Sequence, residues 1–235
     1  MPILTRSPDL LIDADAVLRG QGADPAIIRA RKPVLVRAAQ QAIQDGVPLL
    51  KPEVAFTRLR VHSREPGRVI LDGGFTLTGE DVARLLAQAD EVIAAVCTVG
   101  GEIEGRAAQI LADDLVAGLA LEGVGSAAVE ALENWACRHW EEEAAAHGLQ
   151  TTIPLNPGMI GWPIEVGQPE IFAILGRAEL PVSLNEHAMM KPTKSLSLVI
   201  GLGSAVRAEG IVCDVCPVRD TCRYRITPSD ITMLK

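Results

Sequence analysis

The sequence N-P-G-M-I-G-W-P-I at residues 156–164, with N-E-H-A-M-M-K-P-T-K-S-L-S-L-V-I-G-L-G at residues 185–203, decides the fold. In the first stretch, prolines and glycines surround one large aromatic side chain, Trp162. In the second, a polar, methionine-rich segment that contains a proline runs directly into an apolar strand. Loops rich in Gly and Pro usually form turns and nothing more. Two such loops on either side of one predicted helix, residues 168–175, can instead form the walls of a ligand site.

Two apolar segments predict strands that lie in the core. Residues 195–203 alternate in a way that indicates at least one buried face. Residues 91–99 are nearly all apolar without alternation, which is typical of a strand buried on both faces. Gly100-Gly101 and a predicted helix follow, as in many phosphate-binding loops. Because no GxGxxG or Walker pattern is present, we interpret this segment as an ordinary turn.

The remaining elements follow from caps, breakers and periodicity. Asp24 followed by Pro25 indicates a helix start, and Pro33 begins a second helix that stops at Gly46. Thr78 and Asp81 resemble a capping box that opens a helix to about residue 89. The other predicted elements are strands at residues 54–61, 68–71 and 150–154, extended segments at residues 184–190, and one long helix at residues 113–147.

Glu130 lies in an apolar helical setting, A-A-V-E-A-L at residues 127–132. A carboxylate on the apolar side of a helix needs a partner or a ligand. The alternative is that Glu130 points to solvent.

Composition bounds the class of protein. The chain has 235 residues, of which 48% are hydrophobic and 22% charged, with a formal net charge of −8. This balance is ordinary for a globular protein and argues against a nucleic-acid surface, which needs a basic face. No uninterrupted apolar run reaches the roughly 18 residues that span a bilayer, and the first residues lack the apolar core of a signal peptide. We therefore expect a cytoplasmic protein that does not bind membranes.

We expect three regions along the chain. Residues 1–90 form an N-terminal helical and β segment packed on the main domain, residues 91–205 form the core, and residues 206–235 form a cysteine-rich tail.

The tail contains Cys213, Cys216 and Cys222 in a C-x2-C-x5-C pattern. Three close thiols suit an iron–sulfur cluster or zinc, although they can also remain uncoordinated. A fourth ligand is not evident nearby; Cys97, a histidine, a small molecule or a partner's side chain are the alternatives.

The central stretch resembles the reactivation domain of cobalamin-dependent methionine synthase and the small free-standing proteins related to it. The likeness extends over about residues 91–203. It rests on Pro157-Gly158, Gly161-Trp162-Pro163, the helix with Ile171, Phe172 and Leu175, and an E-x-x-x-M-x-P-x-x-S-x-S pattern formed by Glu186, Met190, Pro192, Ser195 and Ser197.

The resemblance implies an α+β fold, a twisted antiparallel sheet with flanking helices. It also implies binding of S-adenosylmethionine and assistance in the reductive reactivation of a corrinoid. Positioning is the protein's contribution to such chemistry, so no general base is required and catalytic residues remain unknown. The chain lacks the Asp-x-His-x-x-Gly segment of cobalamin domains, and the corrinoid is therefore expected on a partner protein.

The resemblance also suggests site residues. Pro157, Gly158, Gly161 and Trp162 would line the S-adenosylmethionine pocket with backbone groups, and Glu130 and Glu186 would face its charged groups. Asn156, Met190 and Ser195 complete the candidate set. For Ser195 the alternative is that it satisfies strand backbone, and for Met190 that it belongs to the core.

Two hypotheses about function follow. In the first, the protein is an accessory of a corrinoid-dependent methyltransferase that binds S-adenosylmethionine. In the second, it is a non-catalytic module that docks on or caps a corrinoid protein without that ligand. Asn156 stands where the family has an arginine, a stronger carboxylate anchor, and this favours the second. The intact Gly-Trp-Pro loop favours the first.

Overall fold

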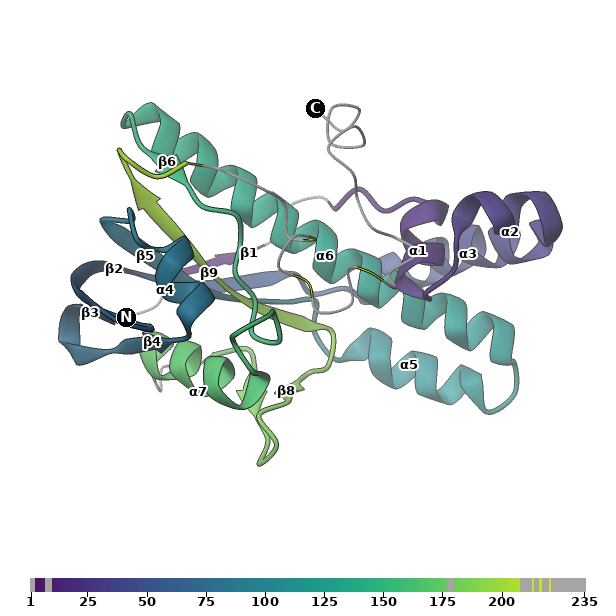
Figure 1. Ribbon diagram of the computed structural model, residues 1–235. Helices are drawn as coiled ribbons and strands as arrows, with labels where there is room; N and C mark the ends of the chain where they lie inside the picture. The colour runs from purple at the N-terminus through teal and green to yellow at the C-terminus, as the bar shows by residue number, and fades with distance from the viewer. Residues whose placement is uncertain are drawn as a thin grey trace.

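A computed structural model describes residues 3–6, 10–176 and 180–207, together with Cys213, Cys216 and Asp220. These residues form an α+β fold in which helices cover both faces of a twisted antiparallel sheet (Figure 1). The strands are β1 (Ile3–Arg6), β2 (Glu53–Glu65), β3 (Arg68–Leu71), β4 (Thr76–Thr78), β5 (Glu91–Thr98), β6 (Gln150–Thr151), β7 (Ser183–Leu184), β8 (Met190–Lys191) and β9 (Ser195–Gly203). The helices are α1 (Ala14–Gly20), α2 (Pro25–Arg31), α3 (Pro33–Gly46), α4 (Glu80–Leu85), α5 (Glu102–Leu111), α6 (Leu115–Ala146) and α7 (Ile164–Leu175), with short 3-10 turns η1 (Val47–Leu49) and η2 (Asp72–Gly74).

The main sheet of the described chain has the strand order β4-β3-β2-β5-β9-β6, and β1 also pairs with β2. Along its length, β2 changes partner: its first part pairs with β5, and its last residues pair with β3. At the centre, β5 and β9 run antiparallel from the pair Glu91–Leu202 to the pair Thr98–Ser195. The sheet therefore joins a segment near residue 95 to one near residue 200.

The central strand β5 is buried on both faces, as its unbroken apolar pattern predicts. Its side chains alternate: Val92, Ala94 and Val96 pack with α4 and α7. Ile93, Ala95 and Cys97 pack with α6 on the other face. Burial on both faces removes the need for polar alternation, because neither face meets water.

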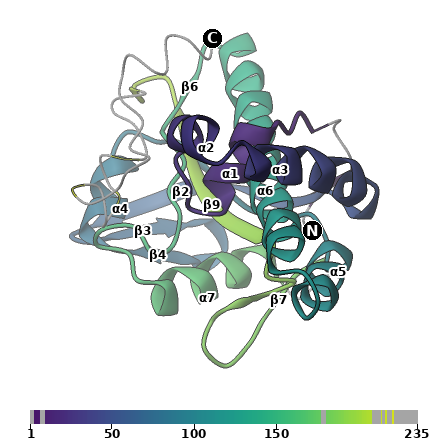
Figure 2. The same ribbon diagram turned by 90° about the vertical axis from the view of Figure 1, so that its right-hand side faces the viewer.

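A second lobe consists of helices. The helices α1, α3 and α5 pack around the first half of α6 in a separate apolar cluster that includes Leu18, Ile103 and Leu121 (Figure 2). Small residues permit this packing: a Cβ at Gly123 would lie 2.7 Å from the carbonyl oxygen of Val17. The helix α6 thus belongs to both lobes, the first half to the helical lobe and the second to the sheet.

Length and composition alone would allow α6 to cross a membrane. Its most apolar window has a mean hydropathy of 1.5, and 56% of that window is buried inside this fold. A core helix shared by two lobes meets the same criteria, since its first half packs in the helical lobe and its second half packs on the sheet.

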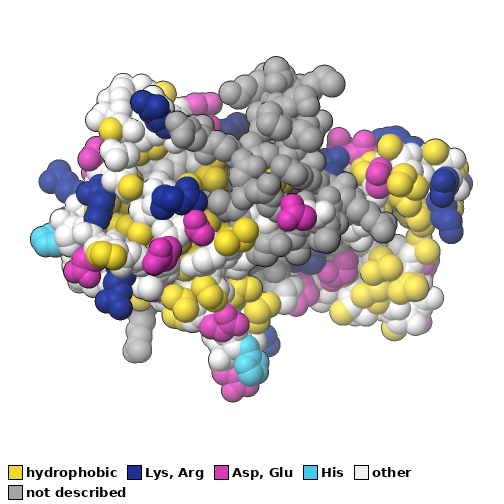
Figure 3. All heavy atoms as spheres, viewed as in Figure 1, with side chains coloured by type: hydrophobic (Ala, Val, Ile, Leu, Met, Phe, Trp, Pro, Cys, Tyr) yellow, Lys and Arg dark blue, Asp and Glu magenta, His cyan; other side chains and the backbone are white. Residues whose placement is uncertain are grey.

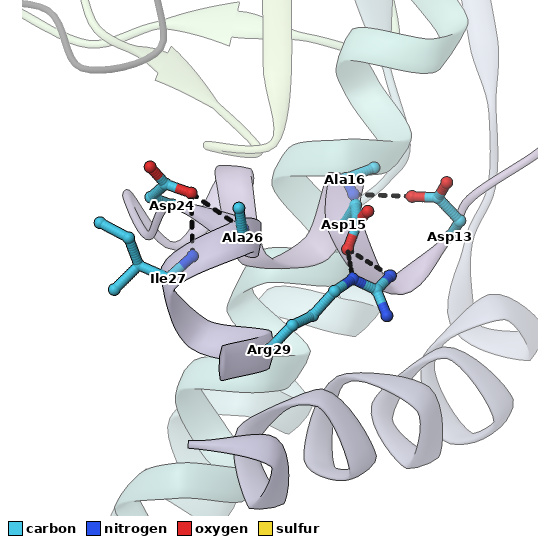
Figure 4. Close-up of polar contacts among 7 residues, drawn as sticks. All are labelled: Asp13, Asp15, Ala16, Asp24, Ala26, Ile27 and Arg29. Carbon is cyan, nitrogen blue, oxygen red and sulfur yellow. Dashed lines mark hydrogen bonds and ion pairs between the residues drawn. The ribbon is translucent and has the colours of Figure 1, made fainter. Parts of the chain in front are cut away.

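The helix starts confirm part of the sequence analysis. The carboxylate of Asp24 accepts hydrogen bonds from the amides of Ala26 and Ile27, so α2 begins where predicted, and Asp13 caps α1 in the same manner (Figure 4).

The predicted capping box at Thr78 and Asp81 is wrong. Helix α4 follows Gly79 without a side-chain cap, because Thr78 belongs to β4 and donates its amide to Glu170.

Helix α7 begins at Ile164, earlier than the predicted residue 168. Gly167 lies within its first turn. A Cβ at Gly167 would lie 2.7 Å from the ring of Trp162, so this glycine is required by packing rather than by chain reversal.

Candidate functional site

The loop at residues 156–163, called here the Trp162 loop, closes on itself through its backbone. The amide of Gly158 donates to the carbonyl of Trp162 at 2.7 Å, and the amide of Trp162 donates to that of Met159 at 3.1 Å. Gly158 and Gly161 have φ angles of +100° and +75°, which glycine adopts without strain. The glycines of the motif therefore shape a compact turn.

The side chain of Trp162 anchors this loop in the core. It is fully buried, and its indole Nε1 donates to Glu170 Oε2 at 3.1 Å. A buried indole usually finds such a partner. Trp162 thus fixes the loop on α7, and its ring offers no surface to a ligand.

The tip of the Trp162 loop has backbone groups to offer. Ile160 is 45% exposed. Within the described residues, no hydrogen-bond partner is found for the amides of Ile160 and Gly161. The carbonyl of Gly161 lies against Gly79, where a Cβ would approach it to 2.6 Å. Any backbone contact to a ligand would come from this tip, beside the start of α4.

Asn156 holds the other end of the Trp162 loop. Its Nδ2 donates to Glu133 Oε1 at 2.6 Å and to the carbonyl of Ser197 at 3.1 Å. The same amide therefore ties the loop to α6 and satisfies the open edge of β9.

Glu133 is the acidic residue that the sequence reasoning missed. Burial raises the pKa of its carboxyl group, the hydrogen bond from Asn156 lowers it, and the charge of Glu130 raises it further. Glu130 itself is exposed, as the solvent alternative holds. Helical spacing could have identified Glu133, because it lies four residues after Val129 and four before Cys137, both of which are buried.

The serines of the motif are satisfied inside the protein. Ser195 Oγ donates to Thr98 Oγ1 at 2.9 Å and also lies 2.8 Å from the carbonyl of Pro192. Ser197 Oγ donates to Gln168 Oε1 at 2.9 Å. Both serines are buried, so they hold β9 to its neighbours, as the alternative for Ser195 states.

The β7–β8 hairpin projects beyond α7 with acidic and histidine side chains at its tip (Figure 3). The side chain of Glu186 is 86% exposed there. Met190, in β8, packs against the sheet core. A hollow of about 340 Å³ lies beneath the tip and is lined by Glu165, Pro169, Leu184, Asn185, Glu186, His187 and Ala188. Its two carboxylates suit a positively charged group.

The turn between β5 and α5 is structural. Glu102 pairs with Lys51, and Glu104 accepts the amide of Thr193 at 3.0 Å. Two carboxylates at this helix start would repel a phosphate group. The interpretation of Gly100-Gly101 as an ordinary turn is consistent with these contacts.

The cysteines divide into two groups. Cys97 and Cys137 are buried between α6 and the sheet, and burial raises the pKa of both thiols. Cys213 and Cys216 are half-buried free thiols, and Cys222 lies outside the described residues. Among the residues that the structure describes, no group of three potential metal ligands comes together. The predicted cluster or zinc site remains a prediction.

Comparison with known proteins places the fold. No protein-family model matches the sequence, and no curated protein matches it. Among solved structures, the chain is similar to the crystal structure of the MetH reactivation domain bound to AdoHcy. The TM-score is 0.63 at 14% sequence identity, over 95% of this chain and 85% of that one.

The described chain thus has the α+β fold of a reactivation domain, which confirms the predicted fold class. The solved structure is a domain of cobalamin-dependent methionine synthase, the protein whose reactivation domain residues 91–203 resemble in sequence. The likeness now extends through the N-terminal helices and strands as well.

Proposed function

We propose that this protein is an accessory of a corrinoid-dependent methyltransferase, which binds S-adenosylmethionine and assists reductive reactivation of a corrinoid carried by a partner. One observation carries the proposal: nearly the whole chain shares its fold with a reactivation domain that was crystallised with AdoHcy. AdoHcy is what remains of S-adenosylmethionine after its methyl group has been transferred.

The chain's own part in this function is positioning. The exposed tip of the Trp162 loop would bind the ligand through backbone groups, while buried Trp162 and Asn156 keep the loop in place. The carboxylates of Glu165 and Glu186 provide a negative environment for a sulfonium or ammonium group. The partner's corrinoid, once reduced by one electron from an external donor, would accept the methyl group, and AdoHcy would leave.

A second function is favoured by a different observation. Asn156, Ser195 and Ser197 are all engaged in internal hydrogen bonds, so most of the motif's polar side chains serve the fold. On that basis the protein would dock on a corrinoid protein as a non-catalytic module without binding S-adenosylmethionine.

Calorimetric titration of anaerobically purified protein with S-adenosylmethionine and with AdoHcy separates the two functions. Saturable binding is expected under the first. Glu186→Ala is expected to weaken binding of the positively charged S-adenosylmethionine more than that of AdoHcy, because only the former carries a sulfonium charge.

Glu142→Ala provides the matched control, since this glutamate is exposed on α6 away from the hairpin. It should leave both affinities unchanged. Absence of binding at millimolar concentrations of both ligands would eliminate the first function and leave the docking module.

A further inference from the structure

The helix α4 presents a stripe of side chains toward the segment that follows β9. Arg84, Leu85 and Gln88 lie on one side of a hollow of about 510 Å³, and Ala205, Val206 and Arg207 lie on the other. Arg84 and Leu85 lie at the end of α4, and Gln88 lies in the turn that follows it. We call this feature the α4 hollow.

The guanidinium group of Arg84 is held in a fixed orientation. Asp81 Oδ1 accepts from its Nη2 at 2.7 Å and from its Nε at 3.2 Å. Within the described residues, no partner of its Nη1 is found. A guanidinium has five N–H donors, so the group retains donors for a ligand after binding Asp81.

The α4 hollow also adjoins the Trp162 loop. A Cβ at Gly161 would lie 2.9 Å from Asp81 Oδ2, so the loop tip presses on the carboxylate that orients Arg84. The exposed backbone of the tip and the arginine therefore belong to the same surface.

The charge and size of the hollow define its ligand. Two arginines from distant segments line it, although the chain has a net charge of −8. Its volume lies within the range of roughly 300–1,000 Å³ that is usual for small-molecule sites. Leu85, Ala205 and Val206 add aliphatic surface, and none of the described residues that line the hollow is an aromatic residue for base stacking.

We propose that the α4 hollow binds the carboxylate end of a small organic molecule, with Arg84 as the principal anchor. Arginine binds carboxylate and phosphate groups through paired N–H donors. One such carboxylate is that of S-adenosylmethionine, and for that ligand the inference rests on the proposed function. Inorganic phosphate shares the chemistry and serves as an independent probe.

Titrations of the wild-type protein, Arg84→Gln and Arg106→Gln test the proposal with three probes: S-adenosylmethionine, decarboxylated S-adenosylmethionine and inorganic phosphate. Arg84→Gln should weaken S-adenosylmethionine binding by about tenfold, the loss of one exposed charge-assisted contact. The decarboxylated ligand should bind both proteins equally. Phosphate should bind the wild type and compete with S-adenosylmethionine, and Arg84→Gln should remove this competition.

Arg106, exposed on α5, is the matched control and should behave as wild type. Arg84 has a side chain that is 63% exposed, so its substitution should not unfold the protein. Equal affinities of the wild type and Arg84→Gln for both S-adenosylmethionine and phosphate overturn the proposal, as does a wild type that binds neither.

If the wild type binds phosphate through Arg84 but does not bind S-adenosylmethionine, the proposed function fails and the anion site stands. The two ideas are therefore tested separately.

Discussion

Glu133 places a carboxyl group between α6 and the edge of β9, and its surroundings make stability depend on pH. Burial raises its pKa above the ordinary value of 4.5. The folded protein therefore keeps this proton to higher pH than the unfolded chain does. The protonated Glu133 carboxyl group therefore contributes to stability fully below the pKa that it has in the unfolded chain. The unfolding free energy then falls as pH rises through the raised pKa of the folded protein.

We expect Glu133→Gln to remove this decrease of the unfolding free energy with rising pH. Glutamine keeps an oxygen that can accept from Asn156 but carries no charge to desolvate, so the variant should be about 1 kcal/mol more stable than wild type at pH 8. Thermal melts between pH 4.5 and pH 8 measure the difference. Glu142→Gln, at an exposed position on the same helix, should follow the wild-type curve. A parallel pH dependence in Glu133→Gln would show that another group is responsible.

Gly161 has a left-handed backbone conformation and also lies close to Asp81. Gly148 has a similar backbone but no close neighbour, so a comparison of the two separates backbone strain from steric overlap. Both have positive φ, +75° and +70°, but no atom lies within 4 Å of a Cβ at Gly148. Alanine at either position should cost about 1 kcal/mol for the backbone conformation. Gly161→Ala should cost about 1 kcal/mol more because its methyl group meets Asp81. Chemical denaturation gives both values; equal losses would mean that Asp81 moves aside freely.

At the scale of elements, identical substitutions in two helices should have opposite effects. In α5, a Cβ at Gly105 meets nothing within 4 Å, so Gly105→Ala should stabilise by about 0.5–1 kcal/mol through helix propensity. In α6, Gly123→Ala should destabilise by about 1–3 kcal/mol, because the new methyl group overlaps the backbone of α1. Hydrogen exchange should show the loss concentrated in α1 and α3. A stabilised Gly123→Ala would contradict the close packing of these helices.

Sequence patterns predict the elements best where burial or a cap decides them. The apolar run of β5, the alternation of β9 and the Asp24 cap are local signals, and each element is found. The start of α7 and the role of Glu133 depend on how side chains pack in the folded protein. No local pattern shows that Gly167 makes room for Trp162, or that Asn156 reaches Glu133.

The same distinction applies to the candidate site. The Trp162 loop is visible as a motif, because glycine and proline restrict the backbone locally. Arg84 gives no sequence signal, because its partners in the α4 hollow come from the other end of the chain. The family resemblance identified the fold, but it did not show which polar side chains are engaged in hydrogen bonds inside the protein.

At the scale of the whole molecule, α6 joins the helical lobe to one face of the sheet, and the sheet joins that face to the cluster around α4 and α7, so unfolding should be a single transition. Trp162 lies between the sheet and α7, whereas Trp140 belongs to α6 and packs against the opposite face of the sheet. The chain has three tryptophans, so the variants Trp140→Phe and Trp162→Phe both also carry Trp135→Phe. Replacing Trp135 and Trp140 then leaves Trp162 as the fluorescent reporter, and replacing Trp135 and Trp162 leaves Trp140. Within each variant, fluorescence and far-ultraviolet circular dichroism should give the same midpoint. Separate midpoints would mean that the lobes unfold independently.

The position of β9 at the centre of the sheet has a consequence for synthesis on the ribosome. β5 ends at Thr98 and β9 begins at Ser195, so the edge of β5 that will pair with β9 has no partner while the residues between them are translated. Long-range strand pairing of this kind delays folding and exposes aggregation-prone surface. We therefore expect slower translation before residue 203 to lengthen this exposure.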